Sequence, residues 1–480
     1  MKQQPRLILH EDRFFDPSPT VRTIARKLYR RVKDLPIISP HGHVDPNIFV
    51  DNEPFPNPTE LFLIPDHYIY RMLYSQGIPL ESLGIPALDG SRGEVDARKI
   101  WKLFGDHYYL FRGTPTGAWL NHEFSVVFGI KQRFSGATAM AIYDEIQAKL
   151  KTPKFRPRAL FDRFNIEVLS TTDAATDTLA PHQKLRASGW KGNIIPCFRP
   201  DGVTDLNKPT WRTNIDLLSL RSGIEPSSFR RYIEALENRR SFFKSMGAVS
   251  TDHGILTPYT HELSEREVEK LFQRALKGRA TQEDAAAFTA HMMMEMARMS
   301  VEDGLVMQIH PGSDRNHNAL IAAKYGLDKG CDIPTQTEYT RNLKELLNKY
   351  GNDPRFSVLV FTLDETTYAR ELAPLAGHYP AMKLGPPWWF HDSIEGMMRF
   401  RTMVTETAGI YNTAGFNDDT RAFVSIPARH DLSRRVDSNF LATLVARHIV
   451  DPDEAEEMVV ALANGLVRSA YRLPTHVKNA

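Results

Sequence analysis

The chain has 480 residues, of which 42% are hydrophobic and 25% charged, and its formal net charge is +2. These values are typical of a globular protein and argue against nucleic acid or a membrane surface as a partner. Only two cysteines occur, Cys197 and Cys331, without a CxxC motif, which argues against a disulfide framework or a thiolate zinc site. With no apolar run long enough to span a bilayer, we expect a soluble, cytoplasmic protein.

The N-terminal part predicts a helix that leads into a short strand. Residues 20–34 carry apolar side chains at helical spacing, and Ile37-Ile38 then form an apolar run that ends in His41-Gly42-His43. Residues i and i+2 of a strand point to the same face, so the two imidazoles should converge on one point. Such a pair predicts a metal site but does not specify the metal.

Residues 57–160 predict a helical insertion. The helical patterns lie around residues 61–75, 95–111 and 137–151 and are separated by polar or proline-containing loops. We therefore expect three parts. These are residues 1–56 with the first helix and strand, residues 57–160 as the insertion, and residues 161–480 as the remainder of the main domain.

After the insertion, short apolar strands alternate with helices. The strands are predicted at residues 166–170, 193–197, 248–250, 305–309, 357–361, 381–384 and 410–414. Together with the first strand they make eight, and this alternation favours an α/β fold with a closed parallel (β/α)8 barrel. Asp392 and Glu395 predict a capping box at the start of one of the intervening helices.

Polar residues follow the strands, where barrels of this type carry their chemistry. Arg199, Arg315 and Arg421 each come after a different strand, and guanidinium groups suit a carboxylate ligand. Asp418 or Asp419, after the last strand, would lie beside the first strand and could join the two histidines as a third metal ligand. Two imidazoles and one carboxylate leave coordination positions open, as catalytic sites require. The residues thus predict an acidic, polyhydroxylated small molecule bound at a metal.

A series of short motifs between about residues 36 and 440 matches one family pattern in order. The motifs are His41-Gly42-His43, Asp66-His67-Tyr68 with Arg71, Thr171-Thr172-Asp173, Arg199-Pro200-Asp201, Asp252-His253-Gly254, Gln308-Ile309-His310 with Arg315, Trp388-Trp389-Phe390, and Asp419-Thr420-Arg421 followed by Arg429-His430. This set resembles the uronate isomerases, also called glucuronate isomerases, a divergent branch of the amidohydrolase superfamily.

The resemblance implies a distorted (β/α)8 TIM barrel of the metal-dependent hydrolase type, with the helical insertion after strand one. It also implies one divalent metal, most often Zn²⁺ with Mn²⁺ or Fe²⁺ as alternatives, and uronic acids as substrates, and it leaves homo-oligomerisation open. The metal ligands would be His41, His43 and Asp419. The implied catalytic residues are Tyr68, Asp419, Arg421 and His310, and the implied substrate-binding residues are Arg199, Asp252, Arg315 and Trp388.

The implied reaction interconverts D-glucuronate with D-fructuronate and D-galacturonate with D-tagaturonate. A single base on one face of a cis-enediol can move the proton between C2 and C1. Tyr68 and Asp419 are both candidates, and Tyr68 would need a pKa lowered by Arg421 or the metal. The chain departs from the family pattern in the loop between His310 and Arg315 and at residues 364–368, so the preferred uronate stays open.

Two other functions fit the same pattern. One is a mononuclear metal-dependent hydrolase of the lactonase type, because this barrel hosts many chemistries. A two-metal hydrolase is disfavoured, since Lys244 precedes the fourth strand instead of following it. The other is a non-catalytic barrel that binds sugar acids, against which the intact set of ligands argues.

Overall fold

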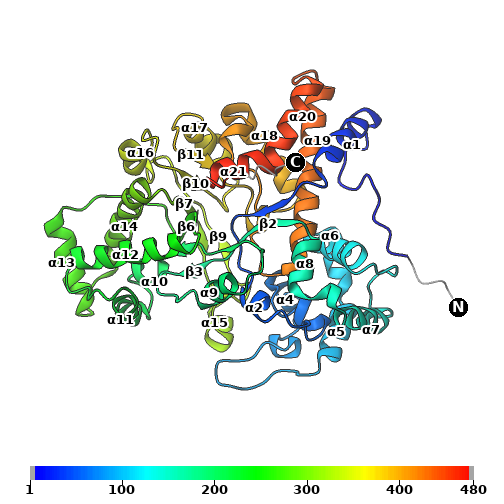
Figure 1. Cartoon of the computed structure of the whole chain (residues 1–480), viewed down its shortest axis with the longest axis horizontal. Helices are drawn as coiled ribbons and strands as arrows, with labels where there is room; N and C mark the ends of the chain where they lie inside the picture. The colour runs from blue at the N-terminus through cyan, green and yellow to red at the C-terminus, as the bar shows by residue number, and fades with distance from the viewer. Residues whose placement is uncertain (1–5, 475–480) are drawn as a thin grey trace.

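The computed structural model describes residues 6–474, and its centre is a ring of short parallel strands surrounded by helices (Figure 1). The strands are β1 (Ile37–Ser39), β2 (Ile166–Ser170), β3 (Asp173–Ala174), β4 (Ile194–Ile195), β5 (Phe198–Arg199), β6 (Ser250–Ile255), β7 (Val306–Pro311), β10 (Val358–Val360) and β11 (Met382–Leu384), with a small antiparallel pair β8 (Ser313–Asp314) and β9 (Ile333–Pro334) outside the ring. Each of the first seven predicted strands has a counterpart, but the fourth, predicted at residues 248–250, is displaced and runs from Ser250 to Ile255.

Strands β2 and β3 together form the second position of the ring and β4 and β5 the third, and each position pairs in parallel with the following one. The pairs are β1–β2, β2–β4, β3–β5, β5–β6, β6–β7, β7–β10 and β10–β11. The third predicted strand is split into β4 and β5 at Pro196, which has no N–H to donate to a neighbouring strand. Consecutive parallel pairing with helical connections defines a singly wound barrel, so the predicted fold class is confirmed.

The eighth predicted strand, residues 410–414, is wrong for most of its length. Ile410–Asn412 form a 3₁₀ turn, and only Thr413 bridges to Leu384. Gly409 and Gly415 flank the segment with φ of 66° and 74°, and such left-handed backbone interrupts a strand. An extended loop replaces the strand and closes the ring, with the His43 N–H donating to the Thr420 carbonyl at 3.0 Å.

Helices occupy the segment between β1 and β2, as predicted. They are α2 (Asn47–Asp51), α3 (Pro58–Phe62), α4 (His67–Tyr74), α5 (Ala97–Asp106), α6 (Pro115–His122), α7 (Ala139–Leu150) and α8 (Pro157–Arg163). They enclose an aromatic core in which Trp101 contacts Phe104 and Phe134 and donates to the Ala139 carbonyl at 2.9 Å. Figure 1 shows these blue and cyan helices on one side of the ring. The division of the chain into three parts stays a prediction.

The remaining helices pack around the ring. They are α1 (Pro19–Val32), α9 (Ala180–Ala187), α10 (Asp201–Thr204), α11 (Trp211–Ser222), α12 (Phe229–Ser245), α13 (Glu265–Leu276), α14 (Gln282–Asp303), α15 (Ala319–Tyr325), α16 (Lys344–Tyr350), α17 (Ala373–Ala376), α18 (Ile394–Ala408), α19 (Ile426–Ala446), α20 (Pro452–Val460) and α21 (Leu466–Ala470). As predicted, α1 buries a helically spaced apolar face, which includes Ala25 and Leu28.

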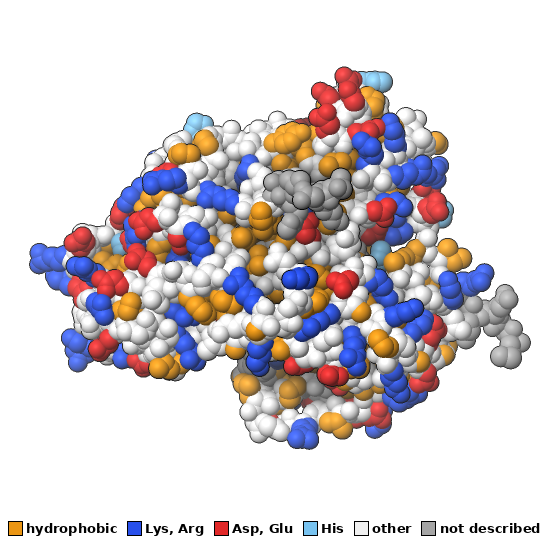
Figure 2. All heavy atoms as spheres, in the orientation of Figure 1, with side chains coloured by type: hydrophobic (Ala, Val, Ile, Leu, Met, Phe, Trp, Pro, Cys, Tyr) orange, Lys and Arg blue, Asp and Glu red, His pale blue; other side chains and the backbone are white. Residues whose placement is uncertain are grey.

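The surface agrees with the near-zero net charge. On the face shown in Figure 2, basic and acidic side chains are interspersed rather than gathered by sign. Within residues 6–474, no helix combines the length and the apolar character needed to cross a membrane. The absence of nucleic-acid binding stays a prediction.

Candidate active site

A cavity of about 980 Å³ opens at the carboxyl ends of the strands, where the sequence places the chemistry. The cavity brings together all of the predicted site residues. These are His41, His43, Tyr68, Arg199, Asp252, His310, Arg315, Trp388, Asp419 and Arg421. They come from the insertion and from the ends of strands far apart in the sequence, so the closed barrel is what assembles them.

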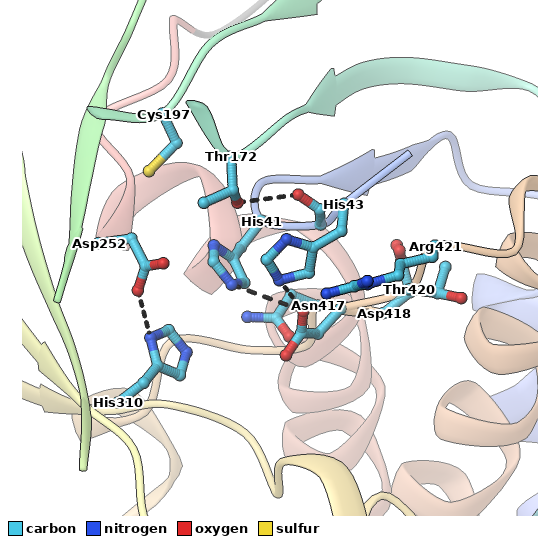
Figure 3. A network of polar contacts seen from close by, with 12 residues as sticks. His41, His43, Thr172, Cys197, Asp252, His310, Asn417, Asp418, Thr420 and Arg421 are labelled. Atoms are coloured by element: carbon cyan, nitrogen blue, oxygen red, sulfur yellow. Dashed lines mark hydrogen bonds and ion pairs between the residues drawn. The ribbon is translucent and has the colours of Figure 1, made fainter. Parts of the chain in front are cut away.

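Two imidazoles and one carboxylate meet at the junction of β1 and the closing loop. Asp419 Oδ1 lies 3.5 Å from His41 Nε2 and 3.2 Å from His43 Nε2. Figure 3 shows the two imidazoles side by side. Within the described residues Asp419 Oδ1 is buried and has no hydrogen bond of acceptable geometry. Nitrogen and oxygen ligands bound at 2.0–2.1 Å in a tetrahedral site lie about 3.3–3.4 Å apart, so these three atoms fit a divalent metal.

A second set of three, made by His41, Asp252 and His310, also brings its ligand atoms within 4.8 Å of one another. In that set, however, His310 Nδ1 already donates to Asp252 Oδ1 at 2.7 Å. Asp252 is thus engaged at both oxygens, since Arg199 Nη1 lies 3.3 Å from Oδ2, whereas Asp419 Oδ1 has no hydrogen-bond partner within the described residues. The His41, His43 and Asp419 set is therefore the better fit.

The two adjacent aspartates of the closing loop point in different directions. Asp418 Oδ2 accepts from His430 Nε2 at 2.9 Å, and the Asp418 carbonyl accepts from Arg429 Nη1 at 3.2 Å. Asp419 adopts φ of +35°, a backbone conformation that non-glycine residues reach only at a cost of about 1–3 kcal/mol. This backbone conformation directs the Asp419 side chain toward His41 and His43. The geometry therefore favours Asp419 over Asp418 as the third metal ligand, a choice that the sequence left open.

His310 and Asp252 form a buried pair beside this cluster (Figure 3). The His310 ring stacks on that of His41 with centroids 4.8 Å apart, and its Nε2 atom is buried without a hydrogen-bond partner in the described chain. Burial lowers the pKa of His310 despite the opposing charge of Asp252. The ring is therefore neutral near pH 7, with Nδ1 protonated and Nε2 free to bind a ligand.

The hydroxyl of Tyr68, at the first turn of α4, is paired with a carboxylate, although the guanidinium carbon of Arg429 lies 5.1 Å from the centroid of the Tyr68 ring. Its hydroxyl donates to Asp392 Oδ2 at 3.1 Å, and Arg429 Nη1 donates to the same oxygen at 2.8 Å. Burial, reinforced by the Asp392 charge, raises the pKa of Tyr68 well above its ordinary value. The lowered pKa that a tyrosine base would require is thus absent.

The predicted arginines lie around the mouth of the cavity, and each pairs with a carboxylate of the chain. The shortest of these contacts are Arg199 Nε with Asp201 Oδ2 at 2.8 Å, Arg315 Nη1 with Asp332 Oδ2 at 3.1 Å, and Arg421 Nη2 with Asp328 Oδ2 at 3.1 Å. Arg199 also lies 3.3 Å from Asp252, so it connects the mouth to the His310 pair. The Trp388 ring packs edge-on against the His310 ring, with the two ring centroids 4.8 Å apart.

Asp392 contacts Tyr68 behind the cavity, a position that the sequence did not predict. The predicted capping box with Glu395 is wrong, because Ser393 caps α18 by accepting from the Gly396 N–H at 3.0 Å. Asp392 instead joins Tyr68 to Arg429. Asp328, which pairs with Arg421, was not predicted, and its only sequence signal is its place between two turn-forming glycines.

The closed barrel and the imidazole–carboxylate cluster define a (β/α)8-barrel protein of the metal-site type. A solved structure described as a putative metal-dependent hydrolase from Lactobacillus casei shares this fold, with a TM-score of 0.50 and 12% identity over 93% of this chain and 97% of that one. A more specific match follows from the sequence. Residues 16–467 match the family model of glucuronate isomerase, and the chain belongs to that family.

Individual relatives agree with this assignment. A uronate isomerase from Phenylobacterium zucineum is 55% identical over 467 residues, which cover 97% of each chain. The crystal structure of glucuronate isomerase from Caulobacter crescentus matches with a TM-score of 0.97 and 54% identity over 99% of each chain. A uronate isomerase structure from Thermotoga maritima matches with a TM-score of 0.90 and 28% identity, over 97% of this chain and 99% of that one. The predicted resemblance and the prediction of an isomerase are confirmed.

Proposed function

We propose that this protein interconverts D-glucuronate with D-fructuronate and D-galacturonate with D-tagaturonate. One observation carries the proposal: a cluster able to bind a metal and a set of guanidinium groups face the same cavity in a chain of the glucuronate isomerase family. A uronate offers an anionic carboxylate at one end and neighbouring oxygens at the other. The two halves of the cavity match these two ends.

One divalent metal ion would be held by His41, His43 and Asp419, and we propose Zn²⁺, with Mn²⁺ or Fe²⁺ as alternatives. Imidazole nitrogen and carboxylate oxygen suit all three metals, so the donor set does not choose among them. A metal bound here would act as a Lewis acid that withdraws charge from the substrate oxygens.

The arginines of the mouth would hold the substrate carboxylate. Arg199, Arg315 and Arg421 all line the cavity, and guanidinium groups bind carboxylates through paired, charge-assisted hydrogen bonds. Holding C6 at the mouth directs C1 and C2 toward the buried histidines. Binding energy from the non-reacting end then positions the reacting carbons, which contributes to the rate as well as to the affinity.

Asp419 is our candidate for the residue that takes the proton from C2 and returns it to C1. Its carboxylate lines the cavity beside His41 and His43, which outweigh the effect of burial and lower the pKa of Asp419, so the group is ionised. Tyr68 stays protonated and donates a hydrogen bond. His310 can bind a substrate oxygen through Nε2, while Asp252 fixes its ring in the required tautomer.

A coupled assay with purified, metal-replete protein tests the proposal. We expect ketose formation from D-glucuronate, D-galacturonate or both, and elemental analysis that finds close to one divalent metal per chain. A lactone substrate serves as the control, because a lactonase would release acid without forming a ketose. Absence of ketose from both uronates would refute the proposed function. We also propose that the protein acts in the cytoplasm, which both cysteines being free supports.

A further inference from the structure

A carboxylate of the chain already occupies the arginines at the mouth of the cavity. Asp328 lies in the loop between α15 and β9 and lines the cavity together with Arg315 and Arg421. Its Oδ2 atom accepts from Arg421 Nη2 at 3.1 Å, and its Oδ1 atom lies 4.0 Å from Arg315 Nη1. Within residues 6–474, Asp328 is the one carboxylate that forms an ion pair with Arg421. The pair resembles the contact that an acidic ligand would make.

The backbone of Asp328 is held by two hydrogen bonds, whereas its side chain is partly exposed to solvent. The Asp328 N–H donates to Asn316 Oδ1 at 3.2 Å, and the Asp328 carbonyl accepts from the Tyr70 hydroxyl at 3.0 Å. Its φ of +59° is in the left-handed region, which aspartate and asparagine tolerate better than most residues. The side chain is 48% exposed. The carboxylate can therefore turn away from the arginines while the loop keeps its hydrogen bonds.

Asp332 in the same loop is a carboxylate that stabilises the loop itself, and it differs from Asp328 in burial and in hydrogen bonding. Its side chain is only 2% exposed, and it accepts from both the Asn316 N–H at 2.8 Å and Arg315 Nη1 at 3.1 Å. Asp328 has neither the burial nor a second hydrogen bond from a fixed backbone group to its carboxylate. Partial removal of water inside the cavity raises the pKa of Asp328, but the charges of Arg421, Arg315 and Arg199 outweigh this effect and lower the pKa, so the group stays ionised.

We infer that Asp328 is a resident counter-ion of the cavity, which the carboxylate of an acidic substrate displaces from Arg421. This inference rests on the proposed uronate isomerase function. Asp328 keeps the guanidinium groups paired when no substrate is bound, and its return to Arg421 helps to release the acidic product. It weakens the binding of carboxylates while leaving neutral sugars unaffected, because a neutral ligand does not compete for the arginines.

The test is the variant Asp328→Asn, since asparagine keeps the left-handed backbone and both backbone hydrogen bonds but carries no charge. We expect the KM for D-glucuronate to fall about two- to fivefold, the range that corresponds to one partly exposed ion pair. We expect kcat not to rise, because faster product release is lost. Asp314→Asn is the matched control, since Asp314 also lines the cavity but forms no ion pair within the described chain. Its effect on KM should be smaller.

Two unreactive open-chain ligands separate displacement from a general effect on the cavity. L-gulonate is glucuronate with its aldehyde reduced and keeps the carboxylate, whereas D-glucitol has a hydroxymethyl group in its place. Calorimetry should show tighter binding of L-gulonate to Asp328→Asn and unchanged binding of D-glucitol. A raised KM, or equal shifts for both ligands, would mean that Asp328 supports Arg421 and would overturn the inference. If the wild-type protein forms no ketose, the proposed function fails, whereas the calorimetric comparison still tests Asp328.

Discussion

The floor and the mouth of the cavity use the same kinds of charged side chain under different conditions. At the floor, the side chains of Asp252 and His310 are 2% and 4% exposed and their atoms are 2.7 Å apart. At the mouth, those of Arg421 and Asp328 are 40% and 48% exposed and 3.1 Å apart. Electrostatic interactions are stronger where water is excluded and are screened where it is present. Changes at the floor should therefore abolish chemistry, and changes at the mouth should adjust affinity.

The largest effect is expected from Asp419→Asn at the floor. The variant removes the carboxylate that both histidines face, so we expect loss of bound metal and a fall in kcat/KM of more than about 100-fold, beyond the 10- to 100-fold typical of residues behind the ligands. Elemental analysis and the ketose assay measure the two losses. Asp418→Asn is the control and should retain its metal, because Asp418 faces His430. Equal metal loss in both variants would remove the distinction between the aspartates.

His310→Gln should come next. Removing the buried imidazole takes away the free Nε2 atom, so we expect kcat to fall about 10²- to 10⁴-fold with little change in KM. Asp252→Asn should lower kcat in the same direction, because an amide can stabilise the wrong tautomer of His310. Steady-state kinetics, together with thermal unfolding to verify the fold, check both variants. A KM effect without a kcat effect would place His310 with the residues of the mouth.

A change at the mouth should act mainly on binding. Arg421→Met removes a guanidinium group from the carboxylate end of the cavity, so we expect the KM for glucuronate to rise about 10- to 100-fold, as the loss of one charge-assisted hydrogen bond predicts. Arg421→Lys keeps the charge and should recover part of the affinity. The affinity for D-glucitol, measured by calorimetry, should not change. If kcat fell while KM stayed unchanged, Arg421 would act in the chemical step instead of in binding the substrate carboxylate.

The smallest effect on activity is expected outside both regions. Glu123, at the start of the π-helical turn η3 (Glu123–Val127), is buried, and burial raises its pKa to about 8. A raised pKa favours the neutral acid in the folded state, so this stability is complete below the unfolded pKa of about 4.5 and is lost as the pH rises through 8. We expect wild-type protein to lose about 4 kcal/mol relative to Glu123→Gln between pH 5 and pH 9, because about three pH units separate pH 5 from the folded pKa. Denaturant unfolding at both pH values measures the difference, and parallel pH curves would contradict it.

The sequence predicted the floor of the cavity better than its closing loop. The apolar run at Ile37-Ile38 and the i, i+2 spacing of His41 and His43 are local patterns, and local patterns determine which residues a strand presents to one face. The segment at residues 410–414 also begins with apolar side chains, Ile410 and Tyr411, but does not form a strand. Its outcome depends on the backbone angles of Gly409 and Gly415, which composition does not specify.

Paired charges were the other source of error. Asp392 precedes a helix and has a glutamate three residues later, as in a capping box. The N-cap is nevertheless Ser393, and Asp392 instead accepts hydrogen bonds from Tyr68 and Arg429. Asp328 and Arg421 are 93 residues apart, and no spacing rule connects them. Side chains that meet through the closure of the barrel, rather than through neighbouring turns of one element, can be predicted only when the whole topology is known.

The junction between β1 and the closing loop also affects the thermal stability of the barrel. At this seam the strand ladder is interrupted, and a backbone hydrogen bond from His43 to Thr420 joins the two ends of the ring. His41, His43 and Asp419 lie across the same seam, so a cation shared among them would act as a clasp between the beginning and the end of the barrel. The melting temperature should then increase with the concentration of that cation, because the cation binds only when the two ends of the ring are joined.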